Sequence, residues 1–324
     1  MPADAATKSH KRVAVRVKHK IKASPQRIIS TIRSSKAYHT RPAATSQSEG
    51  QDAVFATAGS LQLASSKALI VNQDTGETLY AKSTDTPTPI ASVTKLMTAM
   101  VMLDMHLPMD EQVSVTDEDV DTLKNTTSRL RVGTSLPRGE MLQLALMASE
   151  NRAASTLAHT TPVSYSAFVA AMNRKAAELG MKQSHFADPT GLNSDNVSTA
   201  EDLVRMVKAA YQYPEIRKAS TSQSLEVPVH GLKRLVEFKN TNILVRQAEA
   251  DWDIGLSKTG YISEAGRCLV MQAKIAEQPL IIVLLDSYGK FSRIGDAQRI
   301  RKWMESSNDG AKRRVSDAGQ RPEG

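Results

Sequence analysis

The sequence predicts a mixed α/β fold of the α+β kind, with an antiparallel sheet flanked by helices and a mostly helical insert. Runs of apolar and β-branched residues typical of strands occur at 67–82 and again at 255–285. The long stretch between them has apolar residues at helical spacing. Strands at both ends of the patterned region, with helices between them, favour a sheet that shares a cleft with a helical insert.

The first elements are a β-hairpin and a buried helix. Lys67–Asn72 and Thr78–Lys82 flank Gln73-Asp-Thr-Gly-Glu77, whose Asp-Thr-Gly has the residue types of a hairpin turn. Ile90–Leu103 is apolar on almost every side, and a helix of that kind is a buried one.

The remaining elements follow in order along the chain. The segment 110–137 is polar and irregular. Helices are then expected at 139–147, 153–158 and 167–179, a turn at 188–192, and a further helix from Thr199. Strands are expected at 255–259, 266–275 and 279–285, followed by a helix at 294–304. We therefore predict one folded domain over 58–305, with a helical sub-domain at about 104–230 and a polar C-terminal tail at 306–324.

The charge of the chain is concentrated at its beginning. Residues 1–50 contain 11 Lys and Arg against 2 Asp and Glu, whereas the formal net charge of the whole chain is +8. Residues 1–57 are also rich in Ser, Thr, Ala and Pro without apolar periodicity, so we predict a disordered basic leader. Such a leader favours anionic surfaces, by peripheral contact with membrane or cell wall, over nucleic acid; it could also be solvated without a partner.

Ser92-Val-Thr-Lys95 is the candidate nucleophilic segment. The i, i+3 spacing puts Ser92 and Lys95 on one helix face, and burial can lower the lysine pKa until it accepts the serine proton. The same pattern occurs again as Ser287-Tyr-Gly-Lys290. That copy ends a strand and contains Gly289, so it lacks a helix to align its members, and Ser92 is the preferred nucleophile.

Ser149-Glu-Asn151 is the candidate second segment. It ends the apolar helix predicted at 139–147, a rigid support that can position a catalytic hydroxyl. Ser149 could relay a proton, and Asn151 could bind Lys95 and a substrate carbonyl, while Glu150 is expected to point away and be chemically idle. The alternative Ser194-Asp-Asn196 lies in a polar loop and is less suitable.

Lys258-Thr-Gly260 is the candidate third segment, on a predicted strand. Lys258 could attract a substrate carboxylate and help keep Lys95 neutral by repulsion, Thr259 could hydrogen-bond the carboxylate, and Gly260 leaves room for a substrate backbone. Alternation puts Lys258 and Thr259 on opposite faces of the strand. Both can reach one site only if that strand edge lines the cleft.

Other chemistries have little support in the sequence. The single cysteine, Cys268, lies in an apolar run and is expected to be a buried hydrophobe. The seven His residues show no metal-ligand spacing, and no phosphate-binding loop is present, so we predict no metal and no cofactor. No apolar stretch of membrane-spanning length and no signal-peptide hydrophobic region is found.

The three segments in this order resemble those of penicillin-binding proteins and class A β-lactamases. The segments 89–100, 146–154, 188–192 and 256–262 are similar to those of low-molecular-mass penicillin-binding proteins, the D-alanyl-D-alanine peptidases. The Ser-Glu-Asn variant and the 266–271 strand look closest to the D-alanyl-D-alanine endopeptidase branch, of the penicillin-binding protein 7 type. The resemblance covers about 61–304 and implies a serine β-lactamase/transpeptidase-like fold.

The resemblance also implies roles for these residues. Ser92 would form an acyl-enzyme with a D-alanyl carbonyl in peptidoglycan stem peptides, with Lys95 as its proton acceptor. Ser149 and Asn151 would assist transfer to the leaving amine. Lys258 and Thr259 would hold the carboxylate beside the scissile bond, and the N–H groups of Ser92 and Tyr261 would form the oxyanion hole, next to Gly260.

Several readings follow from this resemblance. The leading one is a periplasmic serine D,D-endopeptidase that β-lactams inhibit covalently; the chain ends soon after the last predicted helix, which is expected to leave out the extra C-terminal β-domain of the carboxypeptidase branch. The alternatives are a D-alanyl-D-alanine carboxypeptidase acting on pentapeptide stems, a serine β-lactamase and a non-catalytic wall-binding factor. The chain has no Glu-x-x-Leu-Asn segment of the kind that places a deacylating glutamate in class A β-lactamases. The periplasmic location depends on the resemblance alone.

Overall fold

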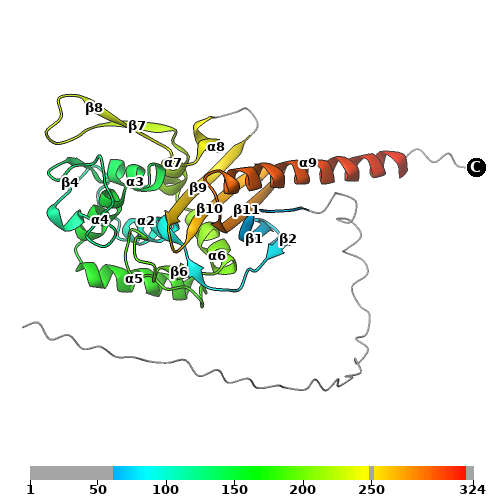
Figure 1. Cartoon of the computed structure of the whole chain (residues 1–324), viewed down its shortest axis with the longest axis horizontal. Helices are drawn as coiled ribbons and strands as arrows, with labels where there is room; N and C mark the ends of the chain where they lie inside the picture. Colours follow the sequence, from blue (N-terminus) through cyan, green and yellow to red (C-terminus); the bar gives the residue numbers. More distant parts are fainter. Residues whose placement is uncertain (1–60, 248–251, 319–324) are drawn as a thin grey trace, which may run out of the picture. The chain divides into compact units, whose positions relative to one another are not determined.

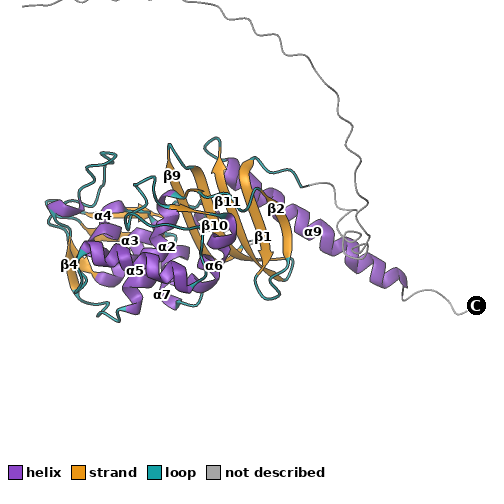
Figure 2. Cartoon of the chain, turned by 90° about the horizontal axis from the view of Figure 1, so that it is seen from below, coloured by secondary structure: helices purple, strands orange, loops and turns teal. Residues whose placement is uncertain are grey.

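The structure, a computed structural model, describes residues 61–247 and 252–318, with side chains up to 308. Its central element is a five-stranded antiparallel sheet in the order β2-β1-β11-β10-β9. The strands are β1 (Ser65–Asn72), β2 (Thr78–Lys82), β9 (Asp253–Ile262), β10 (Gly266–Ile275) and β11 (Gln278–Ser287). β1 pairs with β11, so the two ends of the folded region meet in one sheet, and β9 is an edge strand (Figures 1 and 2).

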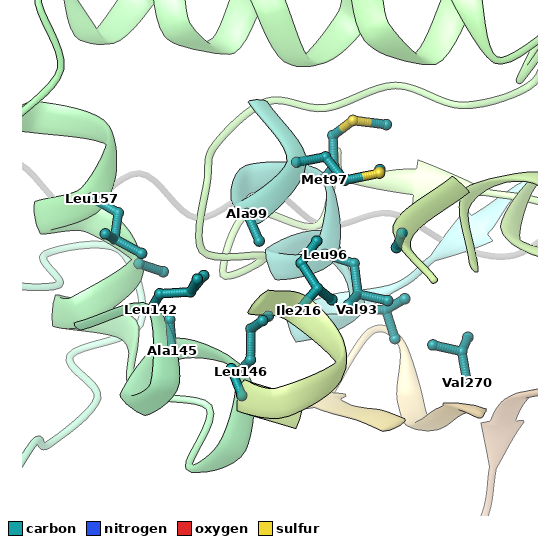
Figure 3. Close-up of a cluster of buried hydrophobic side chains, with 14 of the residues drawn as sticks. Val93, Leu96, Met97, Ala99, Leu142, Ala145, Leu146, Leu157, Ile216 and Val270 are labelled. Atoms are coloured by element: carbon teal, nitrogen blue, oxygen red, sulfur yellow. The ribbon is translucent and has the colours of Figure 1, made fainter. Parts of the chain in front are cut away.

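A layer of helices covers one face of this sheet. Its centre is the 3₁₀ turn η1 (Ala91–Thr94), which leads directly into α2 (Lys95–Asp104). Around it lie α3 (Arg138–Met147), α4 (Asn151–His159), α5 (Tyr165–Glu178), α6 (Ala200–Ala210) and α7 (Pro214–Thr221). Figure 3 shows Val93, Leu96, Leu146, Ile216 and Val270 in the core between these helices and the sheet. Burial of α2 on all sides explains why its sequence has no polar face.

The other face of the sheet packs against α9 (Ser292–Ala318), which crosses the strands (Figure 2). Ile294, Ala297, Ile300 and Met304 of this helix are buried against the sheet. The buried carboxylate of Asp296 accepts hydrogen bonds from the backbone N–H groups of Ala64 and Ser65, at 2.9 and 2.8 Å. The first turns of the last helix therefore fasten the start of the first strand.

Short elements complete the helical layer. They are β3 (Thr88–Pro89), β4 (Gln112–Ser114), η2 (Asp117–Asp119), β5 (Ser135–Pro137), β6 (Val197–Ser198), β7 (Ser224–Pro228), β8 (Leu235–Lys239) and α8 (Ile243–Arg246). β3 pairs with β6, β4 with β5, and β7 with β8. In the described part of the chain, no helix is both long and apolar enough to cross a membrane.

The antiparallel sheet with its helical layer is confirmed, and so are the predicted strands and most helices. Three expectations differ from the structure. The helix predicted from Ile90 begins as a 3₁₀ turn, and the irregular segment 110–137 contains β4 and β5. The last helix runs to Ala318, through most of the predicted polar tail, because extending a helix nucleated on the core costs little. The predicted leader, 1–57, lies outside the described residues, and the boundaries at 58 and 305 remain predictions.

Candidate active site

The backbone around Ser92 is held between two glycines. An added Cβ at Gly191 would lie 2.0 Å from the carbonyl oxygen of Ala91, and one at Gly260 would lie 2.9 Å from that of Ile90. Only glycine permits these approaches. Ala91 itself has a φ of 47°, a conformation that non-glycine residues rarely adopt. Ser92 is thus fixed in place by a strained turn and two close neighbours.

Lys95 lies one turn further on, at the start of α2. Its Nζ donates hydrogen bonds to Ser92 Oγ at 2.8 Å, to Asn151 Oδ1 at 2.8 Å and to the carbonyl oxygen of Thr190 at 2.6 Å. Only 1% of its surface is exposed. Burial lowers the pKa of Lys95 to about 7, against the opposing charges of Asp188 and Glu150. A lysine in this state can accept the serine proton.

The turn that supplies the Thr190 carbonyl is organised by Asp188. Its carboxylate accepts hydrogen bonds from the backbone N–H groups of Gly191 and Asn193, both at 2.7 Å, and from Asn196 Nδ2 at 2.9 Å. Asn196 Oδ1 in turn accepts from the N–H of Ala187 at 3.0 Å. The side chain of Asn196, from the alternative Ser-Asp-Asn segment, is therefore engaged in supporting this turn.

Ser149 and Asn151 lie at the junction of α3 and α4. Ser149 has a φ of 59°, and its Oγ lies 2.8 Å from Lys258 Nζ. Asn151 begins α4 and donates through Nδ2 to Thr126 Oγ1 at 3.2 Å. Ser149 and Asn151 therefore approach the two lysines from the same side of the site.

Glu150 points away from the hydrogen-bonded group, as expected, but its charge still acts on Lys95. Its carboxylate accepts a hydrogen bond from Ser128 Oγ at 2.6 Å, and burial raises its pKa. The carboxylate also acts on Lys95, because its negative charge favours the ammonium form of that lysine. Glu150 thus tunes the site from outside the hydrogen-bonded group.

Lys258 projects from β9 toward the helical layer. Besides Ser149 Oγ, its Nζ contacts the carbonyl oxygen of Thr259 at 2.7 Å, and 1% of its surface is exposed. Burial, followed by the charges of Lys95 and Arg293, lowers the pKa of Lys258 well below its usual value. Lys258 was expected to keep Lys95 neutral by repulsion. Burial is the largest cause of the lowered pKa of Lys95, and the two lysines repel each other, so the contribution of Lys258 to a neutral Lys95 stays a prediction.

Thr259 and Gly260 show how an edge strand brings both of its faces to one site. Thr259 points away from Lys258, and its Oγ1 donates to Thr241 Oγ1 at 2.6 Å. Because β9 is an edge strand, the Thr259 side chain lines the cleft, while Lys258 on the other face lies behind Ser149 and meets the site through the Ser149 Oγ. Gly260 also lines the cavity, and the space left by its missing Cβ is bordered by residues 90–92; room for a substrate backbone there stays a prediction.

A cavity of about 440 Å³ joins these groups. It is lined by Ser92, Lys124, Thr126, Ser149, Asn151, Leu192, Thr241, Thr259, Gly260, Tyr261, Ile262, Ser263, Arg267 and Arg293. Six of the eight predicted site residues are in this lining, and the other two, Lys95 and Lys258, lie behind Ser92 and Ser149.

The sequence analysis missed the basic lining residues. Lys124 forms an ion pair with Glu264. Arg293 is 8% exposed, donates through Nη1 to the carbonyl oxygen of Lys290 at 3.3 Å, and has no hydrogen-bond partner for Nε among the described residues. No motif marks Arg293; a basic residue beside the apolar face of the last predicted helix was the only available signal. A guanidinium in this position can bind an anion in the cavity.

Other candidate groups lie apart from this chemistry. Burial raises the pKa of the Cys268 thiol to about 11, which disfavours a nucleophilic thiolate. Nδ1 of His159 lies 2.9 Å from Asp119 Oδ1, away from Ser92. Within residues 61–247 and 252–318, no His, Cys, Asp and Glu side chains are grouped to hold a metal ion.

Comparisons with known proteins agree on one family. A family model described as D-alanyl-D-alanine carboxypeptidase matches residues 53–289. A D-alanyl-D-alanine endopeptidase of Pseudomonas aeruginosa is 46% identical over 245 residues, covering 76% of this chain and 78% of that protein. The Escherichia coli D-alanyl-D-alanine endopeptidase is 43% identical over 260 residues, covering 80% and 83%. Among solved structures, the Streptomyces K15 DD-transpeptidase superposes with a TM-score of 0.68 at 28% identity, covering 76% and 98%.

Proposed function

The chain belongs to the D-alanyl-D-alanine carboxypeptidase family of serine peptidases, and on that basis we propose that it is a D,D-endopeptidase of peptidoglycan. It hydrolyses D-alanyl–diaminopimelate cross-links through an acyl-enzyme on Ser92. The contact of Ser92 Oγ with the buried Lys95 Nζ, at 2.8 Å, carries this proposal, because it joins a nucleophile to a base of suitable pKa. The endopeptidase names of the two similar bacterial proteins support the choice of substrate.

Acylation begins when Ser92 Oγ attacks the D-alanyl carbonyl carbon and its proton passes to Lys95 Nζ. The backbone N–H groups of Ser92 and Tyr261 are proposed to stabilise the oxyanion. When the intermediate collapses, the C–N bond breaks and the leaving amine takes a proton from Lys95, relayed by Ser149. Water then attacks the ester, which frees Ser92 and yields the D-alanyl carboxylate.

In a cross-link, the carbon that bears the leaving amine also bears a carboxylate. We assign this carboxylate to Lys258 and Thr259, with the guanidinium of Arg293 as a further cation on the same side of the cavity. Lys258 lies 2.8 Å from Ser149 Oγ, so one group can both attract the carboxylate and orient the proton relay. A terminal D-Ala–D-Ala presents the same carboxylate, which keeps carboxypeptidase activity as the second function.

The proposal includes covalent inhibition by β-lactams, since a penicillin presents an amide carbonyl and a carboxylate to the same groups. It also includes a periplasmic location, where the substrate lies. The contact of the basic leader, 1–57, with an anionic wall or membrane surface remains a prediction about residues outside the described part of the chain.

The test is to incubate the purified protein with cross-linked sacculi and measure the released muropeptides by mass spectrometry, beside a Ser92→Ala variant. Conversion of dimers to monomers by the wild type alone supports the endopeptidase. Loss of one D-alanine from pentapeptides, with dimers unchanged, would replace it by a carboxypeptidase. No change in either substrate would contradict both activities and favour the wall-binding alternative.

A further inference from the structure

We propose that the stem peptide released from the cross-link binds to a surface that continues from the active-site cavity to the start of α9. This inference rests on the proposed endopeptidase function. The leaving stem peptide, to which it assigns a binding surface, is larger than the D-alanine released from a pentapeptide. The surface, called the rim below, consists of Tyr261, Arg267, Tyr288, Lys290 and Phe291.

The path of the leaving group follows from the residues of β9 and β10 that line the cavity. Lys258 points toward the helical layer, where it meets Ser149, whereas Thr259 points to the opposite face. Thr259 pairs with Leu269, which belongs to the core packed under α9. Thr259, Tyr261 and Arg267 line the same cavity, so a leaving group whose carboxylate is held at Thr259 can continue along Tyr261 and Arg267.

The rim is continuous with the cavity through Tyr261 and Arg267. Tyr261 pairs with Arg267, and Arg267 pairs with Ser287, so these residues form one row across three strands spaced about 4.8 Å apart. Tyr288 directly follows the end of this row. Arg293, which lines the cavity, donates a hydrogen bond to the carbonyl oxygen of Lys290 and thereby fastens the 288–291 loop to the cavity wall.

The rim exposes large aromatic side chains to solvent. Tyr288 is 95% exposed, Phe291 60% and Tyr261 57%. Such a group of aromatic side chains beside a catalytic cavity is typical of a binding surface. Arg267 lies 4.4 Å from the centre of the Tyr261 ring, and Lys290 lies 5.4 Å from that of Phe291.

The charge of the rim selects an acidic partner. No carboxylate in the described residues lies within ion-pair distance of Arg267 or Lys290, although the exposed Asp286 is close to Gly266. A stem peptide carries its own carboxylates, so it is an acidic peptide that can use both cations and stack its amide planes on the rings. The free D-alanine released from a pentapeptide is too small to reach the 288–291 loop. The rim would therefore favour cross-links over pentapeptides.

The rim is tested by measuring three reactions for two rim variants and one control variant. Tyr288→Ala/Phe291→Ala and Lys290→Gln alter exposed side chains outside the cavity lining, and Leu235→Ala, at a 53% exposed position on β8, is the matched control. The reactions are cleavage of a purified cross-linked muropeptide dimer, release of D-alanine from a monomeric pentapeptide, and acylation by a fluorescent penicillin.

We expect kcat/KM for the dimer to fall about tenfold in the double variant and about threefold in Lys290→Gln. Pentapeptide hydrolysis and acylation should stay within about twofold of the wild type, and Leu235→Ala should change none of the three. Equal losses on dimer and pentapeptide, or an unchanged dimer rate, would overturn the rim. A wild type that acylates with penicillin but never cleaves the dimer would instead overturn the endopeptidase function.

Discussion

The chain contains the same four-residue pattern twice, and only one copy places its serine beside its lysine. In Ser92-Val-Thr-Lys95 the serine lies within the 3₁₀ turn that leads into α2, and Lys95 Nζ lies 2.8 Å from Ser92 Oγ. In Ser287-Tyr-Gly-Lys290 the serine ends β11, and its Oγ lies 2.7 Å from Ser65 Oγ in the hydrogen-bond network around Asp296. The exposed Lys290 instead lies over the Phe291 ring.

The difference comes from the backbone that carries each copy. A helical turn brings residues i and i+3 to one face, whereas a strand followed by a glycine turns the two side chains apart. The first copy also has neighbours that a sequence pattern does not contain: Asn151, Thr190 and the two glycines that pack on Ala91. A Ser-x-x-Lys segment is thus a nucleophile only where the fold supplies a helix start, a buried lysine and its acceptors.

The largest expected effect that separates the two copies is on acylation. Ser92→Ala should lower covalent labelling by a fluorescent penicillin by at least about a thousandfold, because it removes the attacking oxygen. Ser287→Ala should label at the wild-type rate, with at most a loss of about 1 kcal/mol in the free energy of unfolding from its buried hydrogen bond. Labelling rates of both variants, with unfolding midpoints as the folding control, make the comparison. Residual labelling of Ser92→Ala at a substantial rate would assign the nucleophile to another residue.

The next effect concerns the glycines beside each copy. Gly191 has a φ of 80°, and an added Cβ would overlap the Ala91 carbonyl, so Gly191→Ala should cost about 3 kcal/mol in the free energy of unfolding. Gly289 has a φ of 89°, but its Cβ would meet only the hydroxyl of Ser292, at 2.9 Å, so Gly289→Ala should cost about 1 kcal/mol.

Denaturant unfolding of the two alanine variants measures this difference, and the penicillin labelling rate reports whether Ser92 has moved. Gly191→Ala should lose stability and labelling together, while Gly289→Ala should keep its labelling rate. Equal stabilities would mean that the turn at Gly191 relaxes freely, and that the nucleophile does not depend on it for its position.

The strands, most helices and the three segments could be predicted because each depends on local pattern: β-branched runs for β10 and β11, an all-apolar run for α2, and short motifs for the site. The remainder depends on tertiary contacts. Arg293 is drawn into the cavity by the packing of α9, and Thr241 by the return of the chain from β8, and neither is marked by a local signal. The effect of Glu150 also required the structure, because its coupling to Lys95 acts through space and not through sequence spacing.

The last comparison is the pH dependence of acylation, which reports the pKa of Lys95 in the first copy. Only the neutral amine of Lys95 can accept the serine proton, and burial places its pKa at about 7. The acylation rate should therefore fall about tenfold per pH unit below about pH 7 and level off above it. Lys290→Gln should leave this profile unchanged, since the second lysine takes no part.

The Glu150→Gln variant tests in which direction the charge of Glu150 shifts the pKa of Lys95. The negative charge of Glu150 stabilises the ammonium form of Lys95, so removing the charge should lower the lysine pKa and move the acid limb to lower pH. Glutamine can still accept the Ser128 hydrogen bond, which keeps the loop in place. The measurement is the rate of penicillin acylation between about pH 5 and pH 9 for the wild type and both variants. A limb that moves to higher pH in Glu150→Gln, or one that shifts in Lys290→Gln, would show that a group other than Lys95 titrates in the acylation step.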